Sequence, residues 1–238
     1  VIDIITAANT FVATVGAINE LGAKIVFVDC DDTFCIDANK IEEKITKKTK
    51  AIAVVHFLGL PANVLRIKQI AKKHKLYLIE DCALSLGAKA NKTHTGLIGD
   101  AGVFSFYPVK HITTAEGGSI LTNNKSLVKR LENLRSHGIV RNKLKHWIYD
   151  IIEPSLNFRI SDLNCALGLS QLRKLTKKIH KKRQIAKSYD NFFNKYSIFR
   201  IPKNNSKFYN SYHLYPLIID FKKTKTSRDI LIRYFLKN

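Results

Sequence analysis

Methionine is absent from the 238-residue chain, which begins with Val1. A sequence with neither a start methionine nor an internal one is expected to be a piece of a longer protein. We therefore expect segments of the parent protein to be missing at both ends.

Long apolar runs and an export signal are also lacking. The longest apolar stretches, 51–55 and 57–60, are far shorter than the roughly 20 residues that a membrane-spanning helix needs. Asp3 lies inside the first apolar run, which is unlike a secretory signal, so the sequence predicts a cytoplasmic protein. The four cysteines form no Cys-x-x-Cys pair, which predicts reduced thiols and no zinc site.

Acidic residues are scarce, because 19 Asp and Glu stand against 40 Lys and Arg, a formal net charge of +21. Such a charge would attract nucleic acid, an anionic lipid surface or a phosphorylated ligand. The basic residues, however, are spread over helical faces such as 40–50, 68–75 and 173–183, without a helix-turn-helix, zinc-finger or RNA-binding pattern. A solvated surface is favoured over a nucleic-acid interface, which remains the alternative.

Short apolar, β-branched runs alternate with amphipathic helical runs, and this pattern is typical of a parallel sheet with crossover helices. The sequence therefore predicts an α/β protein. Asn9 and Asp37 are the expected N-caps of the first two helices, and Gly22 follows the first. The expected strands are 1–6, 24–29, 51–57, 76–81, 102–106 and 119–122, and the expected helices are 9–21, 37–45 and 63–74.

The pattern changes at Ser161, where helical periodicity begins and continues to about Tyr196. A polar stretch, 202–207, then precedes an expected strand over 212–220 and a last helix over 227–237. We expect residues 1–196 to form a large domain with long connecting helices. Residues 197–238 are expected to begin a small C-terminal domain.

Two strand ends carry candidate chemistry. Ligands of parallel α/β sheets bind beyond the carboxyl ends of the strands, and Asp81 and Lys110 follow two expected strands. A confined lysine can lose its proton and form a Schiff base, and pyridoxal phosphate also needs a carboxylate against its pyridine nitrogen. Ser105 is a candidate for the cofactor phosphate. Taken singly, such an Asp is more often a helix cap and such a Lys is usually solvated.

Five segments together resemble the DegT-type sugar-nucleotide aminotransferases, a family of fold-type-I pyridoxal phosphate enzymes. The resemblance covers nearly the whole chain. It implies the fold of the PLP-dependent transferases of fold type I, an α/β fold with a mostly parallel central sheet, flanking helices and the start of a small C-terminal α/β domain. The segments are 10–14, 81–87, 99–118, 134–138 and 157–171.

The family pattern implies a role for five residues. Lys110 matches the lysine that forms the Schiff base and moves protons, and Asp81 matches the partner of the pyridinium nitrogen. Ser105 matches the phosphate-binding serine, Phe11 the aromatic side chain stacked on the cofactor ring, and Asn157 the residue that reaches the phosphate of the neighbouring subunit. The alternatives are a core aromatic for Phe11 and a helix cap for Asn157.

Lys110 also separates two branches of the family. The related sugar dehydratases have His at this position, so the lysine favours transamination. Leu84 departs from the pattern, because a Gln or His usually lies there near the cofactor. A non-catalytic scaffold of the same fold is therefore the alternative.

The resemblance implies transfer of an amino group, normally from glutamate, to C4 of a UDP- or dTDP-linked 4-keto-6-deoxy sugar by a homodimer with a shared active site. The branch most similar to this chain forms UDP-4-amino-4,6-dideoxy-N-acetyl-altrosamine in pseudaminic acid biosynthesis, a route to cell-surface polysaccharides. Perosamine, bacillosamine and 4-amino-arabinose branches are the alternatives. The family's phosphate-binding helix N-terminus lies in a segment that this chain lacks, so we expect the parent enzyme, and not this chain, to be active.

Overall fold

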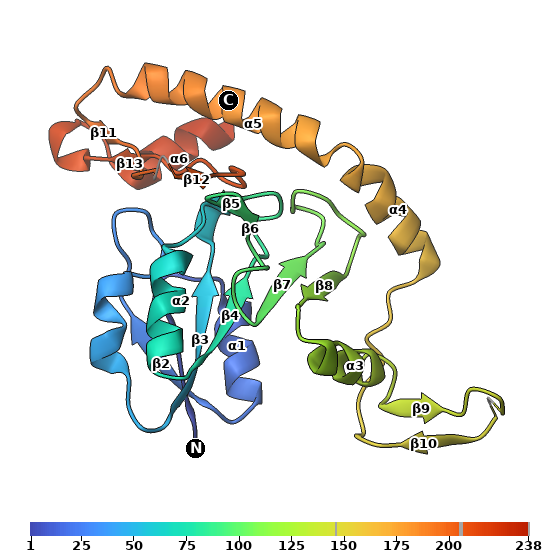
Figure 1. Cartoon of the computed structure of the whole chain (residues 1–238). Coiled ribbons are helices and arrows are strands. Elements are labelled where there is room, and N and C mark those ends of the chain that lie inside the picture. The colour runs from blue at the N-terminus through green and yellow to red at the C-terminus, as the bar shows by residue number, and fades with distance from the viewer. Residues whose placement is uncertain (146, 205–206, 238) are drawn as a thin grey trace.

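The computed structural model describes residues 1–145, 147–204 and 207–237. Its centre is a six-stranded sheet in the order β2-β1-β3-β4-β7-β8 (Figure 1). Strands β2, β1, β3, β4 and β7 are parallel, and β8 pairs antiparallel to β7, which confirms the predicted α/β class and mostly parallel sheet. The strands are β1 Asp3–Ala7, β2 Lys24–Val28, β3 Thr49–Val55, β4 Tyr77–Asp81, β7 Ala101–Ser105 and β8 Gly118–Leu121.

Helices cover both faces of this sheet. Ile5 faces the larger apolar core, which helix α2 (Val64–Lys73) closes. Ile4 faces the opposite side and packs in a smaller cluster with Ile18 of helix α1 (Val12–Glu20). Because successive side chains of a strand point to opposite faces, β1 separates two apolar layers and the sheet is the middle of three.

Two of the expected helices differ from the structure, the first in its start and the second in its type. Phe11, and not Asn9, occupies the N-cap position of α1, and no side chain caps this helix. The expected helix over 37–45 is a pair of 3-10 turns, η1 (Ala38–Lys40) and η2 (Glu42–Lys44). Asp37 does cap η1. The helix does not continue, because the chain bends at Ile41, which is completely buried in the core.

A small three-stranded sheet lies above the carboxyl ends of the central strands (Figure 1). It joins β5 (Lys89–Ala90) and β6 (Thr93–His94) to β12 (Phe208–Tyr209) from the far end of the chain. The 3-10 turn η3 (Phe57–Gly59) follows β3 at the same edge. The C-terminal segment therefore returns to the large sheet beside the strand ends that were predicted to carry the chemistry.

Helix α3 (Lys125–Leu134) and a hairpin of β9 (Ile139–Arg141) and β10 (Tyr149–Ile151) follow β8, and neither was predicted. The long helical region is confirmed as two helices, α4 (Asp162–Leu172) and α5 (Leu175–Phe193). In Figure 1 the hairpin projects from the body of the molecule, while α5 passes over the carboxyl side of the sheet.

The end of the chain contains β11 (Phe199–Arg200) paired with β13 (Ile218–Ile219), a 3-10 turn η4 (Phe221–Lys223) and helix α6 (Arg228–Lys237). The strand expected over 212–220 is therefore mostly wrong. Tyr212 has a left-handed φ of 50°, which interrupts an extended strand. The expected domain boundary after residue 196 stays a prediction. Within the described residues, no helix is long and apolar enough to cross a membrane.

Candidate active site

Asp81 is the last residue of β4, and its carboxylate is fixed by two donors from different segments. Thr14 Oγ1 of α1 donates to Oδ2 at 2.7 Å, and the backbone N–H of Ala83 donates to Oδ1 at 3.0 Å. Thr14 was not among the predicted site residues. Since a carboxylate oxygen accepts more than one hydrogen bond, Asp81 is oriented and still able to accept another.

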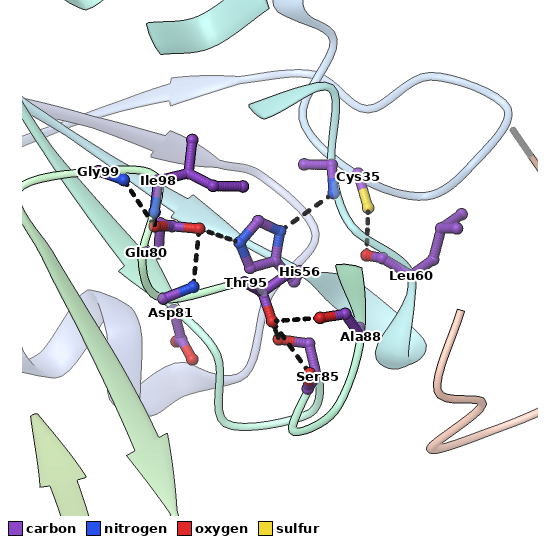
Figure 2. A network of polar contacts seen from close by, with 12 residues as sticks. Cys35, His56, Leu60, Glu80, Asp81, Ser85, Ala88, Thr95, Ile98 and Gly99 are labelled. Atoms are coloured by element: carbon purple, nitrogen blue, oxygen red, sulfur yellow. Dashed lines mark hydrogen bonds and ion pairs between the residues drawn. The ribbon is translucent and has the colours of Figure 1, made fainter. Parts of the chain in front are cut away.

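A buried network supports the strand end from behind, as Figure 2 shows. The carboxylate of Glu80 is fully buried and accepts hydrogen bonds from His56 Nε2 and from the backbone N–H groups of Gly96, Ile98 and Gly99, at 2.6–2.9 Å. The Asp81 side chain points away from this network. Successive residues of β4 thus anchor the strand on one side and present a carboxylate on the other.

The network explains a cluster that resembles a metal site. One ligand atom each of His56, Glu80 and Cys82 lies within 4.8 Å of the others. The Ala62 N–H donates to His56 Nδ1 at 3.1 Å, so the ring proton lies on Nε2 and is donated to Glu80. Burial raises the pKa of the Cys82 thiol, which disfavours the thiolate that a metal needs. The cluster is therefore occupied by its own hydrogen bonds, and we assign no metal to it.

Lys110 lies in the turn that follows β7, where its backbone N–H donates to the carbonyl of Tyr107 at 2.9 Å. The side chain is half-buried, and this burial lowers the pKa of its amino group, although the nearby charge of Asp81 acts in the opposite direction. The structure therefore brings Lys110 and Asp81 together, as their strand ends predicted. No ion pair of Lys110 occurs among the described residues.

Ser105 ends β7, which pairs directly with β4, so Ser105 and Asp81 lie at the same edge of the sheet. The Tyr107 N–H donates to Ser105 Oγ at 3.4 Å. This contact uses the hydroxyl as an acceptor and leaves its proton available for an anionic ligand. Asp81, Lys110 and Ser105 thus lie at the same edge of the sheet, and their function as one cofactor site stays a prediction.

The loop after Lys110 is held by close contacts. Gly117 has a φ of +142°, and a Cβ on Gly118 would lie 2.5 Å from the carbonyl oxygen of Phe104. Gln171 of α4 holds the same loop, because its Oε1 accepts from the Thr113 N–H at 3.3 Å and its Nε2 donates to the Thr113 carbonyl at 3.4 Å. The glycine pair of the sequence motif therefore allows the loop to lie against β7 beneath α4.

Phe11 lies at the N-terminus of α1, three residues before Thr14, and 68% of the residue is exposed. The alternative of a core aromatic is therefore wrong. The connection from β1 to α1 places Phe11 beyond the carboxyl end of β1, at the same edge of the sheet as Asp81. Its stacking on a cofactor ring stays a prediction.

Asn157 lies between the hairpin and α4. Its Oδ1 accepts from the Arg159 N–H at 3.1 Å, whereas the N-cap of α4 is Ser161, so Asn157 does not cap that helix. Within the described residues, no hydrogen bond joins Asn157 to Asp81 or Lys110. A role of Asn157 in the active site of its own chain is thus not supported by a contact.

Two further residues near the site were not assigned a role from the sequence. Thr14 belongs to the segment 10–14 that resembles the family, and this match was the available signal for it. His111 follows Lys110 and is almost completely buried. No sequence signal distinguished His111, because its partners lie in distant segments.

An α/β sheet with an aspartate and a lysine at the carboxyl ends of adjacent strands fits the PLP-dependent transferases of fold type I, and the structural comparison gives that fold. The chain matches Helicobacter pylori PseC, an aminotransferase involved in pseudaminic acid biosynthesis, with a TM-score of 0.93 and 32% identity, covering 99% of this chain and 62% of that one. The model of the DegT/DnrJ/EryC1/StrS aminotransferase family matches residues 2–238, and the chain belongs to this family.

Curated relatives and a second structure agree with this assignment. UDP-4-amino-4,6-dideoxy-N-acetyl-β-L-altrosamine transaminase of Campylobacter jejuni is 39% identical over 91% of this chain and 58% of its own length. GDP-perosamine synthase of Escherichia coli O157:H7 is 36% identical over 91% of this chain and also 58% of its own length. A sugar aminotransferase of Streptococcus pneumoniae, solved in a PMP form, has a TM-score of 0.91 and 28% identity, covering 99% of this chain and 66% of that one. This chain thus spans about three fifths of these curated relatives.

Proposed function

We propose that the protein is an aminotransferase that transfers an amino group from glutamate to the C4 keto group of a nucleotide-linked 4-keto-6-deoxy sugar. The observation that carries this proposal is the juxtaposition of Lys110 and Asp81 at adjacent strand ends in a member of the DegT aminotransferase family. The chain spans about three fifths of the length of its relatives, so we propose this activity for the whole protein.

The donor set fits pyridoxal 5′-phosphate, the cofactor of this family. Asp81 offers an oriented carboxylate to a protonated ring nitrogen, Ser105 offers a hydroxyl proton to a phosphate, and Lys110 offers a half-buried amine. When bound, the cofactor supplies an electron sink for the carbon atom that loses a proton during transamination.

The chain's own residues hold this group and move the proton. The Asp81 carboxylate would accept a hydrogen bond from the protonated ring nitrogen and favour its positive charge, while Thr14 fixes the direction of the carboxylate. Burial lowers the pKa of Lys110, so a larger fraction of its amine is neutral and able to accept a proton at Nζ. Phe11 is proposed to stack on the ring and exclude water from one of its faces.

Among possible sugars, we favour a UDP-4-keto-6-deoxy-N-acetylhexosamine, which gives the 4-amino-altrosamine product. Two transaminases named for this product, both from Campylobacter jejuni, are 39% and 38% identical to the chain. The 36% identity to a GDP-perosamine synthase supports a GDP-linked sugar as the second candidate. A cytoplasmic location stays a prediction.

We propose that the protein acts as a homodimer. Large apolar side chains gather on the exposed surface of the segment that contains the hairpin, Asn157 and α4, and surfaces of this kind mark protein interfaces. In such a dimer, Asn157 would face the partner subunit and donate to its cofactor phosphate. The exposed side chains include Leu144 (89%), Ile152 (68%), Leu156 (68%), Phe158 (63%) and Leu163 (84%).

The test compares the wild-type protein with Lys110→Ala and with Lys177→Ala, a matched change at an exposed lysine of α5. After addition of pyridoxal phosphate, wild type and Lys177→Ala should show a visible absorption band that glutamate bleaches, and borohydride should fix the cofactor to Lys110. Turnover with UDP-linked and GDP-linked 4-keto-6-deoxy sugars then identifies the nucleotide. A wild-type protein that binds no cofactor would instead support a non-catalytic scaffold.

A further inference from the structure

His111 is the residue after Lys110, and only 5% of it is exposed. Its Nε2 lies 3.2 Å from the carbonyl oxygen of Leu84 and 3.1 Å from Ser211 Oγ. Leu84 belongs to the loop that follows Asp81, and Ser211 lies 100 residues further along the chain. A single imidazole ring therefore joins the Lys110 turn to two segments that are distant in sequence.

The direction of these hydrogen bonds is determined by the partners. A carbonyl oxygen only accepts, so His111 Nε2 carries the ring proton and donates it to Leu84. Ser211 Oγ donates its own proton to the carbonyl of Gly59 at 3.2 Å, so it accepts from the same Nε2–H. The tautomer of His111 that carries its proton on Nε2 therefore satisfies both hydrogen bonds, and the two acceptors stabilise this tautomer.

Ser211 is itself docked on the turn that follows β3. It is completely buried, and its backbone N–H donates to the Gly59 carbonyl at 3.0 Å. Gly59 has a φ of +95°, and a Cβ there would lie 2.9 Å from Tyr212 N and 2.6 Å from His213 N. The segment 210–214 therefore reaches the sheet edge through a close backbone approach that requires glycine.

We propose that His111 is a positioning residue, which holds Lys110 against the Asp81 loop and couples its position to the docking of segment 210–214. This inference rests on the role proposed for Lys110. The physical basis is that His111 is covalently adjacent to Lys110, while its ring is fixed from two sides by Leu84 and Ser211. Removal of the ring donor frees the Lys110 turn from both.

The electrostatic surroundings keep this contact constant with pH. Burial, together with the positive charges of Lys182 on α5 and of Lys110 and the neighbouring His213, lowers the pKa of His111 to about 3. The ring centroids of His111 and His213 are 5.4 Å apart, and burial also lowers the pKa of His213 to about 4. His111 is therefore neutral throughout the neutral pH range and keeps one donor pattern.

The experiment measures Lys110 in the cofactor-free protein by competitive acetylation with acetic anhydride from pH 7 to 11, read by mass spectrometry. The labelling of exposed Lys177 serves as the internal reference. Burial gives the wild-type Lys110 amine a lowered pKa, so its labelling curve should titrate earlier than that of a lysine in water. His111→Phe should move this curve to higher pH, because the turn leaves its half-buried position. His111→Gln, whose amide N–H can take the place of Nε2–H, should restore the wild-type curve.

Ser211→Ala gives a second perturbation that removes only one oxygen atom, and it should shift the curve in the same direction as His111→Phe. His180→Phe, at an exposed position on α5, is the matched control and should not shift it. Circular dichroism shows which variants fold; if His111→Phe does not, Ser211→Ala and His111→Gln decide the result. Wild-type curves in the folded His111→Phe and Ser211→Ala variants would overturn the inference. If these shifts are observed but the protein does not bind the cofactor, the proposed function is refuted and the positioning role of His111 stands.

Discussion

Replacement of Glu80 by glutamine is the most informative perturbation of the framework behind the site. The change keeps the size of the side chain but replaces one acceptor oxygen with an NH2 group. Glu80 Oε1 accepts from Ile98 and Gly99, and Oε2 accepts from His56 and Gly96. Whichever way the amide is turned, two N–H donors then face another donor.

His56 cannot relieve this conflict. If its proton moved from Nε2 to Nδ1, the new N–H would face the Ala62 N–H that now donates to Nδ1. Each buried donor left without an acceptor costs about 1–3 kcal/mol. Glu80→Gln should therefore lower the free energy of unfolding by about 2–6 kcal/mol, a large part of the roughly 5–15 kcal/mol of a typical domain.

The effect should depend on pH. Burial alone would raise the pKa of Glu80, but the hydrogen bonds from His56, Gly99 and Gly96 hold this pKa below its ordinary value of 4.5. The folded state thus binds the proton less readily than the unfolded state, so this stabilisation is complete above pH 4.5 and is lost as the pH falls through the folded-state pKa. The difference between wild type and Glu80→Gln should shrink on acidification.

Urea unfolding followed by circular dichroism at pH 7 and at pH 4 measures both effects. Glu132→Gln is the control, because it makes the same chemical change at an exposed position of α3 and should alter stability by less than about 0.5 kcal/mol. A loss below about 1 kcal/mol for Glu80→Gln at pH 7 would refute the reasoning. So would a difference between the two proteins that grows on acidification.

Three further predictions concern the site, the hairpin and the thiols. Thr14→Val removes the hydrogen bond to Asp81 and should raise the dissociation constant of the cofactor at least tenfold, because a hydrogen bond to a charged group contributes about 1.5–3 kcal/mol. Thr14→Ser keeps the hydroxyl and should leave this constant unchanged, and absorbance titration measures both variants. Gly138 has a φ of +71° and no space for a Cβ, so Gly138→Ala should displace the hairpin and weaken dimerisation. The measurement is the fluorescence of the single tryptophan, Trp147: its emission wavelength should change with protein concentration in the wild type and should not change in the variant. Burial raises the pKa of Cys35 to about 12 and also that of Cys82, so thiol titration should detect both only after unfolding.

The inner strands β1 and β3 could be predicted from the sequence because each contains an apolar, β-branched run that is buried along nearly its whole length. β4 and β7 were placed within one residue at each end. The hairpin β9–β10 was missed because its apolar side chains are largely exposed within the chain and give no alternation. The two turns over 38–44 were misread as a helix because a capping Asp37 begins a 3-10 turn as readily as an α-helix.

The candidate site, like the fold, could be predicted only in part. The placement of Asp81, Ser105 and Lys110 at one edge of the sheet could be predicted, because the carboxyl ends of neighbouring parallel strands meet there. The supporting contacts could not, because they join residues with no local relation: Thr14 and Asp81 are 67 positions apart, and His111 and Ser211 are 100 apart. Such pairs follow from the packing of helices and loops over the sheet, which periodicity does not encode.

The side chain and the backbone of Leu84 have different consequences for the site. Its side chain departs from the family pattern, but the contact with His111 uses its backbone carbonyl, which any residue at this position would provide. The departure therefore leaves the link between the Asp81 loop and Lys110 intact, and its effect is confined to what the side chain offers a bound cofactor. Since Thr14 and Ala83 orient Asp81 without Leu84, the missing polar side chain by itself does not argue for a non-catalytic scaffold.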